Sequence, residues 1–297
     1  MTNQQQERLC KAVEDTLRQA IQTPKNFQFL REQIYAVCIC LDDPVEPEPT
    51  APTVVKPKLL TKIVSVNGDS NGASKDEITL KYDANSRISS TVYDGITYNY
   101  TYGTNTIDVK YKNEDGEDRT IAYVLKDGKV VSKTSSYSKY TFDYASGKLQ
   151  EYKEFDVDDN GNEDLEDDYK LTWSGANVTK IAKEGRSYEV TYSTIKGGSV
   201  AAALFLFGGG EVGHFPLDVD EIRRNAPILD KMGDMPEYLP SMVVETREYE
   251  DEGQLKTETT TYTFTYTQNG EGLITALKVV ADSTNEKETT NYTLTWK

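Results

Sequence analysis

The strongest constraint on the fold is a strict alternation of apolar and polar residues that begins after Leu59. The segments Tyr98–Tyr102, Ile107–Tyr111 and Tyr262–Tyr266 each place an aromatic or aliphatic residue at every second position, with Thr, Asn, Asp or Lys between them. Successive side chains of a β-strand point to opposite faces, so this period gives each strand one apolar face and one polar face. The pattern predicts an antiparallel sheet rather than helices or parallel strands.

Short polar turns separate these strands and repeat one theme. An aromatic or aliphatic strand end runs into a polar turn with Gly, as at Leu125–Val130, Tyr144–Leu149 and Trp173–Val178. Asp-Gly and Asn-Gly pairs supply the positive φ angles that tight hairpins need. The sequence therefore predicts a mainly β domain over residues 59–297, built as an antiparallel meander of hairpins that forms a strongly curved sheet or a partly closed barrel.

One segment, residues 195–239, interrupts the alternation. It contains the apolar run Val200–Phe207, a glycine run at 208–210 and a helix-like stretch, Val219–Met232. We interpret it as a helical and Gly-rich insertion into the β domain. It is expected to cap one end or face of the sheet and to fill the interior with its apolar residues.

The first residues of the chain have a different period. Leu9, Val13, Leu17 and Ile21 recur at intervals of four, which predicts a short N-terminal helical segment over residues 1–41. Residues 42–58 follow as a linker, because prolines interleaved with acidic residues favour extended chain over a folded element. The β domain begins after this linker.

The composition limits the classes of partner. The formal net charge of -16 repels nucleic acid phosphates and anionic lipid head groups, so we expect no nucleic acid partner. The longest apolar run, Val200–Phe207, is shorter than the roughly 18 residues that cross a membrane as a helix. A lipid-facing barrel would carry an aliphatic band about 25 Å tall, whereas here Tyr occurs in mid-strand and the mean hydropathy is -0.63. The chain is therefore expected not to span a membrane.

The three cysteines, Cys10, Cys38 and Cys40, all precede the β domain. The domain therefore has no disulfide and no thiolate chemistry. Cys38 and Cys40 form C-x-C, which is not the C-x-x-C of a zinc or redox turn, so we interpret them as small buried residues on a helix.

The hairpin theme and the segment Pro236–Val243 resemble a family of uncharacterised domains with a porin-like fold, found in envelope lipoproteins of gut bacteria. In that family a segment similar to residues 238–241 leads into the last long hairpins, which Tyr262–Val280 resembles. The resemblance covers roughly residues 59–297, and the hairpins also resemble the Tyr-Asp repeats of large secreted toxins. It implies a porin-like fold and a place in the cell envelope or outside the cell. The function of the family is unknown, so the resemblance assigns no active-site residues.

The N-terminus departs from the family pattern. Cys40 precedes an acidic, Pro-rich stretch like the one that follows a lipidated Cys, but Glu32–Val37 is not an apolar leader and Met1–Arg8 is polar. The sequence thus has no conventional signal peptide. Two explanations stay open: residues 1–40 replace the export signal, or the true start of the protein lies elsewhere.

The best site candidate is the loop of residues 156–167, which has the spacing D-x-D-x-N-G with an acid at the twelfth position. Ca²⁺ takes six to eight oxygen ligands, and this spacing wraps them around a sharp Gly turn. Two features favour the alternative of a solvated acidic hairpin tip: the twelfth residue is Asp rather than Glu, and the flanks look like strands. The predicted calcium ligands are Asp156, Asp158, Asn160, Asn162, Asp164 and Asp167.

Other motifs are weaker. The spacing G-x-G-x-x-G at Gly208–Gly213 lacks the surrounding βαβ pattern of a dinucleotide site, and Pro216 follows it, so no nucleotide is expected. His214 is the only histidine and has no Ser nucleophile elbow before it, which argues against a hydrolytic triad. No spacing singles out a carboxylate pair for glycoside hydrolysis.

Two functions from different classes therefore remain, neither of them enzymatic. The first is an envelope or secreted binding module whose Tyr-rich sheet face or barrel mouth contacts a glycan or a peptide. The second is a structural or adhesive spacer whose acidic loop binds Ca²⁺. A hydrolase that the motifs do not reveal is a distant third.

Overall fold

A computed structural model of the chain describes residues 58–69, 72–204, 219–284 and 286–297. These residues belong to one compact unit, Lys58–Lys297. The predicted N-terminal helical segment and the linker before Lys58 lie outside the described residues, and so do the three cysteines.

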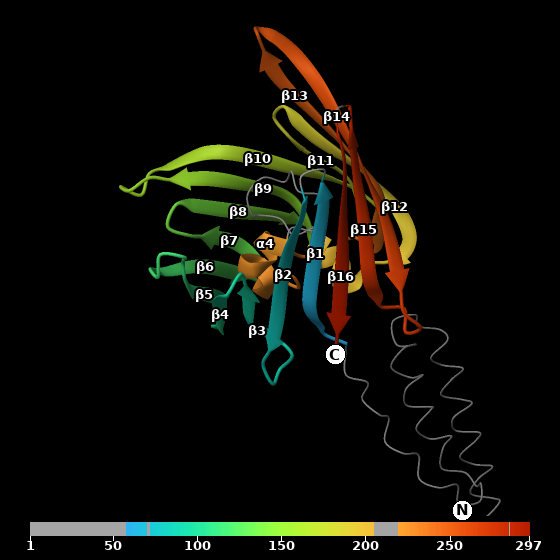
Figure 1. Cartoon of the computed structure of the whole chain (residues 1–297). Helices are drawn as coiled ribbons and strands as arrows, with labels where there is room; N and C mark the ends of the chain where they lie inside the picture. Colours follow the sequence, from blue (N-terminus) through green and yellow to red (C-terminus); the bar gives the residue numbers. More distant parts are fainter. Residues whose placement is uncertain (1–57, 70–71, 205–218, 285) are drawn as a thin grey trace, which may run out of the picture. The chain divides into compact units, whose positions relative to one another are not determined.

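The described residues form sixteen strands in chain order, which Figure 1 labels. Strands that follow one another in the chain are neighbours in the sheet, so the whole sheet is a meander. The strands are β1 (Leu60–Asp69), β2 (Gly72–Tyr82), β3 (Ile88–Tyr93), β4 (Ile96–Tyr102), β5 (Thr106–Lys112), β6 (Asp118–Lys126), β7 (Lys129–Thr134), β8 (Ser138–Ala145), β9 (Lys148–Val157), β10 (Glu163–Ser174), β11 (Asn177–Lys183), β12 (Arg186–Lys196), β13 (Tyr238–Asp251), β14 (Gln254–Gln268), β15 (Ile274–Ser283) and β16 (Lys287–Trp296).

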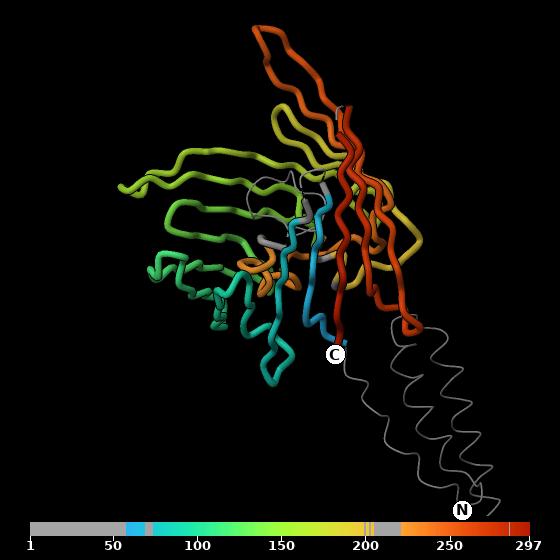
Figure 2. Tube along the Cα trace, in the orientation of Figure 1, coloured from blue at the N-terminus to red at the C-terminus, as the bar shows by residue number. Residues whose placement is uncertain are grey.

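The sheet closes on itself, because the first strand pairs with the last. All neighbouring strands are antiparallel, and β1 lies beside β16 from the pair Leu60–Trp296 to the pair Gly68–Thr289. In Figure 2 this seam is the contact between the blue and the red ends of the described chain. The predicted antiparallel meander is confirmed, and its form is a closed barrel. Closure pairs the strand edges that an open sheet would expose.

The aromatic face of the strands points into the barrel. Tyr98, Tyr123, Tyr152, Tyr169 and Tyr188 are the largest side chains with less than 2% exposure, and they come from five different strands. Burying an aromatic side chain removes a large apolar area from water, so these residues form the main part of the core. Most of the Tyr-rich face is therefore closed to ligands.

The outer face is polar. Cross-strand ion pairs lie on it, such as Lys62–Glu77 at 2.6 Å and Lys180–Glu189 at 3.9 Å. Thr and Asn fill most of the positions between them, for example on β4 and β14. Within the described ranges, no helix has both the length and the apolar character that crossing a membrane requires.

The described parts of the insertion between β12 and β13 pack against the inner face of the barrel. It contains the helices α3 (Gly198–Leu204) and α4 (Val219–Asn225) and the 3-10 turn η2 (Ala226–Ile228). Ile222, Ile228 and Met232 are buried in the same core as the strand residues. The predicted helical stretch 219–232 thus ends early, because Pro227 lacks the N–H that a continuing α-helix needs.

The two ends of the barrel differ. At one, which we call the insertion end, the chain leaves β12 and returns to β13, and the insertion bonds to the rim of the strands: Val130 donates to the carbonyl of Lys231, and Asp234 donates to the carbonyl of Gly147. Gly147 has φ +88, and a Cβ there would lie 2.9 Å from the Asp234 carboxylate, so only glycine fits. We call the opposite end, with the turns at 135–137 and 158–162, the mouth.

A layer of aromatic side chains fastens the insertion end. In six of the hairpins, the aromatic side chain near the end of the second strand donates a hydrogen bond to a backbone carbonyl near the start of the first strand. The donor–acceptor distances are 2.6–2.8 Å. This aromatic layer consists of Tyr82, Tyr102, Trp173, Tyr192, Tyr266 and Trp296, which donate to the carbonyls of Leu60, Ile88, Leu149, Val178, Pro240 and Ile274.

Candidate binding site

A recess of about 300 Å³ opens at the mouth, between α4 and the strands β5 to β8. Its walls combine aromatic rings, hydroxyl groups and charged side chains. The lining residues are Tyr111, Arg119, Thr120, Ile121, Lys133, Ser135, Ser136, Tyr137, Ser138, Tyr140, Glu221 and Arg224.

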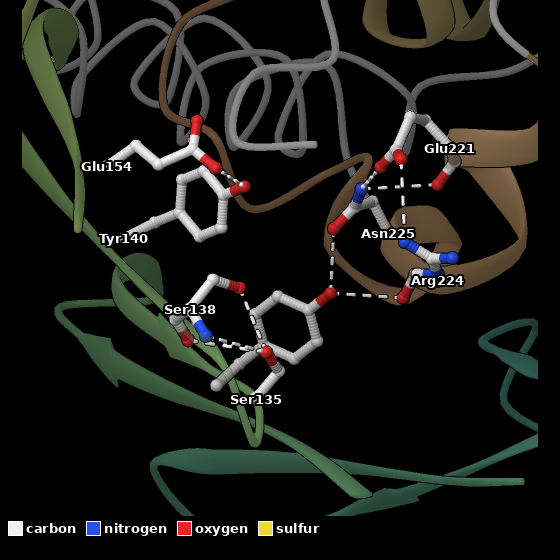
Figure 3. Close-up of polar contacts among 8 residues, drawn as sticks. Ser135, Ser138, Tyr140, Glu154, Glu221, Arg224 and Asn225 are labelled. Atoms are coloured by element: carbon white, nitrogen blue, oxygen red, sulfur yellow. Dashed lines mark hydrogen bonds and ion pairs between the residues drawn. The ribbon is translucent and has the colours of Figure 1, made fainter. Parts of the chain in front are cut away.

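Strand register brings the polar floor of the recess together. Lys133 on β7 pairs with Tyr140 on β8, and Tyr140 pairs with Glu154 on β9, so all of them lie in one inward-facing row. The Nζ of Lys133 lies 4.5 Å from the centre of the Tyr140 ring, and the Tyr140 hydroxyl donates to Glu154 Oε1. Figure 3 shows Tyr140 and Glu154 facing each other in this row. A cation over an aromatic face is attracted by its quadrupole.

Burial changes the charge state of this row. Lys133 is only 4% exposed, and loss of water around the ammonium lowers its pKa to about 8. Burial likewise raises the pKa of the Glu154 carboxyl, which the hydrogen bond from Tyr140 partly offsets. Both shifts have the same origin, because a low-dielectric site disfavours the charged form of either group. Lys133 therefore loses its proton at a lower pH than an exposed Lys does, and Glu154 keeps its proton to a higher pH than an exposed Glu does.

Helix α4 is fixed over the recess by hydrogen bonds to the strands. The hydroxyl of Tyr123 on β6 lies 2.8 Å from Asn225 Oδ1 and 3.0 Å from the carbonyl oxygen of Arg224. Asn225 is fully buried and donates to the Glu221 carboxylate at 2.9 Å, while Arg224 Nη1 lies 3.7 Å from the same carboxylate (Figure 3). These contacts hold Glu221 and Arg224 in the wall of the recess.

The outer lip of the recess is the turn between β7 and β8. Ser135 and Ser138 bond to each other across this turn, at 2.9 Å between their hydroxyl oxygens. Tyr137 at the tip is 62% exposed, and the Arg119 guanidinium lies 5.9 Å from the centre of its ring. Arg119 also forms an ion pair with Glu117. The lip thus offers an aromatic ring and several hydroxyl groups to solvent.

A groove of about 810 Å³ continues from the recess over β4, β5 and β6. It shares Tyr111, Arg119 and Thr120 with the recess. Although β4 begins at Ile96, its ladder with β5 ends at the pair Asn99–Lys110, so the two strands are not paired where the groove lies. An elongated ligand in the recess therefore has a path along the barrel wall.

The predicted calcium loop is the hairpin between β9 and β10. The Asp158 carboxylate accepts hydrogen bonds from the side-chain amide of Asn162 and from the backbone N–H of Asn162 and Asn160, each at 2.8 Å, and these bonds lower its pKa. Asp156 pairs with Asp164 across the strands, whereas Asp167 lies farther from the tip and bonds to Lys183 at 2.6 Å. In the part of the chain that the structure describes, no group of three or more His, Cys, Asp or Glu side chains converges as a metal site. Calcium binding at this loop stays a prediction.

The glycine motif at 208–213 and His214 lie outside the described residues. The residues of the recess were not predicted from the sequence, although one signal was present. Glu154 is in phase with the inward-facing Tyr152 on β9, allowing for the strand's irregularity. A charge on the apolar phase of an alternating strand indicates a polar spot in the interior.

Comparison with known proteins identifies the fold. No family model matches the sequence, and no curated protein matches it. A solved structure described as a porin-like protein from Bacteroides uniformis ATCC 8492 is similar, with a TM-score of 0.56 and 19% sequence identity over 83% of this chain and 99% of that one. The porin-like fold expected from the resemblance is thereby supported, and the described residues form a sixteen-strand barrel of that porin-like type.

Proposed function

We propose that this chain is a non-enzymatic binding protein of the cell envelope or the extracellular space, and that the mouth of its barrel receives a glycan or a peptide chain. The observation that carries the proposal is the recess of about 300 Å³ at the mouth, continued by the groove along the wall. Concave sites with aromatic walls and a few fixed polar groups are where proteins most often bind ligands.

The proposed location rests on the resemblance to envelope lipoproteins and on the porin-like fold of the structural neighbour. We further propose that the barrel wall faces water. Ion pairs in mid-strand, such as Lys62–Glu77, support this, because a charge on a lipid-facing strand costs about 2–4 kcal/mol near the bilayer centre.

A glycan fits the recess better than a peptide does. Tyr137 presents an exposed ring at the lip, and Ser135, Ser136 and Ser138 place hydroxyl groups beside it. Aromatic rings pack on the apolar faces of sugars, while hydroxyl groups exchange hydrogen bonds with sugar hydroxyls. The groove suits a chain of several sugars rather than a single one.

A glycan array probed with the purified chain tests the proposal. We expect binding to a defined set of glycans, and we expect Tyr137→Ala to weaken it by about ten-fold, which corresponds to roughly 1.4 kcal/mol. Tyr249→Ala is the matched control, because Tyr249 is also an exposed Tyr, at 38%, but lies on the hairpin of β13 and β14. Absence of binding to any glycan or peptide, or equal effects of both substitutions, would contradict the proposed site.

The spacer that binds Ca²⁺ is retained as a second proposal. It is supported by the ligand spacing of residues 156–167 and by their place at a solvent-exposed hairpin. It predicts no glycan binding, so the same array separates the two functions.

A further inference from the structure

Basic residues are in excess around the recess and the groove, whereas acidic residues are in excess in the whole chain. The chain has 49 acidic against 33 basic residues. Basic side chains outnumber acidic ones along the recess and the groove: Lys110, Lys112, Arg119, Lys133 and Arg224 line them, against Asp118 and Glu221. A basic site on an acidic protein concentrates anions locally, while the rest of the surface repels them.

The nearby acids offset this charge only in part. Glu117 pairs with Arg119 in a solvent-exposed turn, where ion pairs are worth little. Glu221 is shared between Arg224 and the amide of Asn225. Glu154 lies behind Tyr140, whose hydroxyl donates to its carboxylate, and it is not among the residues that line the recess.

Lys133 is the cation best placed to meet a ligand deep in the recess. Its side chain is 4% exposed and lies over the Tyr140 ring, so its position is held by packing. Among the described residues, the charged groups that act on it are Glu221 and Arg224 from α4 and Glu154 from β9. An anion beside the Lys133 ammonium would stabilise its charged form in this low-dielectric place.

We propose that the ligand of the recess is an acidic saccharide, whose carboxylate or sulfate group lies beside Lys133 and Arg224 while its hydroxyl groups meet Ser135 and Ser138. This inference rests on the proposed function and specifies its ligand class. An acidic sugar carries both kinds of group that the walls can recognise: hydroxyl groups for the serines and an anionic group for the cations.

The first test is an array of paired glycans: oligosaccharides of uronic acids, their carboxyl-reduced neutral counterparts, and sulfated oligosaccharides of matched linkage. We expect the bound glycans to be acidic and to bind about ten-fold or more tightly than their neutral counterparts. The carboxylated and sulfated arms show which anion is preferred. If the neutral counterparts bind equally well, the acidic ligand is wrong but the proposed function stands. If no glycan and no peptide binds, the proposed function fails as well.

The second test uses Lys133 and the best acidic glycan of the array. We expect Lys133→Met to weaken binding about ten-fold, and Lys180→Met, on the outer face beside Glu189, to change it less than about two-fold. Because the Lys133 pKa is about 8, affinity should fall as the pH rises from about 7 to about 9.5, where the ammonium loses its proton.

Lys133→Arg separates the charge from packing. A guanidinium keeps its charge at these pH values, so this variant should bind at pH 7 and lose the pH dependence. Melting curves of each variant show whether the barrel is intact. A wild-type affinity that is constant over this pH range, or a pH dependence that survives in Lys133→Arg, would overturn the role of Lys133.

Discussion

The two ends of the barrel are held together by different kinds of contact. At the insertion end, each member of the aromatic layer donates to a backbone carbonyl, as Trp296 does to Ile274 at 2.8 Å. At the mouth, side chains bond to side chains: Asp167 pairs with Lys183 at 2.6 Å, and Glu245 pairs with Arg186 at 3.1 Å. We call these four residues the charged belt.

The difference has a consequence for how each end tolerates change. A backbone carbonyl is present whatever residue carries it, so the aromatic layer needs only the right donor at the end of each hairpin. The charged belt needs two specific residues on neighbouring strands, and removal of either one takes an opposite charge away from the other in a place with little solvent. Stability that is lost by removing a donor of the aromatic layer therefore cannot be recovered by a second substitution. Stability that is lost by removing one member of a charged-belt pair can be recovered in this way.

Raising the pH above about 10 is expected to have the largest effect, because it acts on the whole interior. Burial raises the pKa of Tyr82 to about 12 and also raises the pKa of Tyr102 and Tyr266 above the ordinary value. Folded Tyr then keeps a proton that the unfolded chain has lost, so stability is complete below about pH 10 and declines above it. We expect cooperative unfolding between about pH 10 and pH 12, measured by circular dichroism and tyrosinate absorbance. Tyrosinate that formed near pH 10 at the layer residues of a barrel that is still folded would show that the layer is open to solvent.

Trp296→Ala is expected to be the most damaging single substitution at the insertion end. Trp296 bonds to Ile274 on β15 and pairs with Leu60 across the seam that closes the barrel. Loss of the packed ring should cost about 3 kcal/mol, or roughly 6–12 °C in Tm. Trp296→Phe keeps most of the packing and loses only the hydrogen bond, so it should cost about 1 kcal/mol. If Trp296→Ala lowered the stability less than Trp296→Phe does, the seam would not depend on this side chain.

Arg186→Met in the charged belt is expected to cost about 2–3 kcal/mol, because it leaves Glu245 buried at 8% exposure without its cation. Adding Glu245→Gln should recover most of this loss, because the amide is neutral and can still accept the hydrogen bond from Tyr262. Urea unfolding of the two single variants and the double variant measures the coupling. If the stability costs of the two single variants simply added up in the double variant, the proposed distinction between the two ends of the barrel would be wrong.

The smallest expected effect is that of Ca²⁺ at the mouth. If the loop of residues 156–167 binds the ion, excess Ca²⁺ over chelator should raise Tm by about 1–2 °C. The gain is small because Asp158 would exchange its turn hydrogen bonds, and Asp167 its bond to Lys183, for the ion. Asp164→Asn, with Mg²⁺ as the control ion, should abolish the rise. An unchanged Tm at millimolar Ca²⁺ would remove the site.

Several features of the fold were predictable because they are local. The alternation at Tyr98–Tyr102 fixed which side chains face inward, and the Asp127–Gly128 turn has the positive φ angles expected, 51° and 75°. The recess was not predictable, because Arg119 and Lys133 lie on neighbouring strands whereas Arg224 comes from a helix much farther along the chain. The predicted calcium ligands are contiguous in sequence, yet the register sends Asp167 away from the tip.

The sequence alone determined the antiparallel strands, their aromatic face and the place of the insertion, because each depends on residue period and turn chemistry within a few positions. Only the tertiary structure decided that β1 and β16 close the barrel, that the Tyr face is buried and that cations meet at the mouth. These outcomes depend on the summed registers of sixteen strands and on where the insertion packs, and no short segment contains that information.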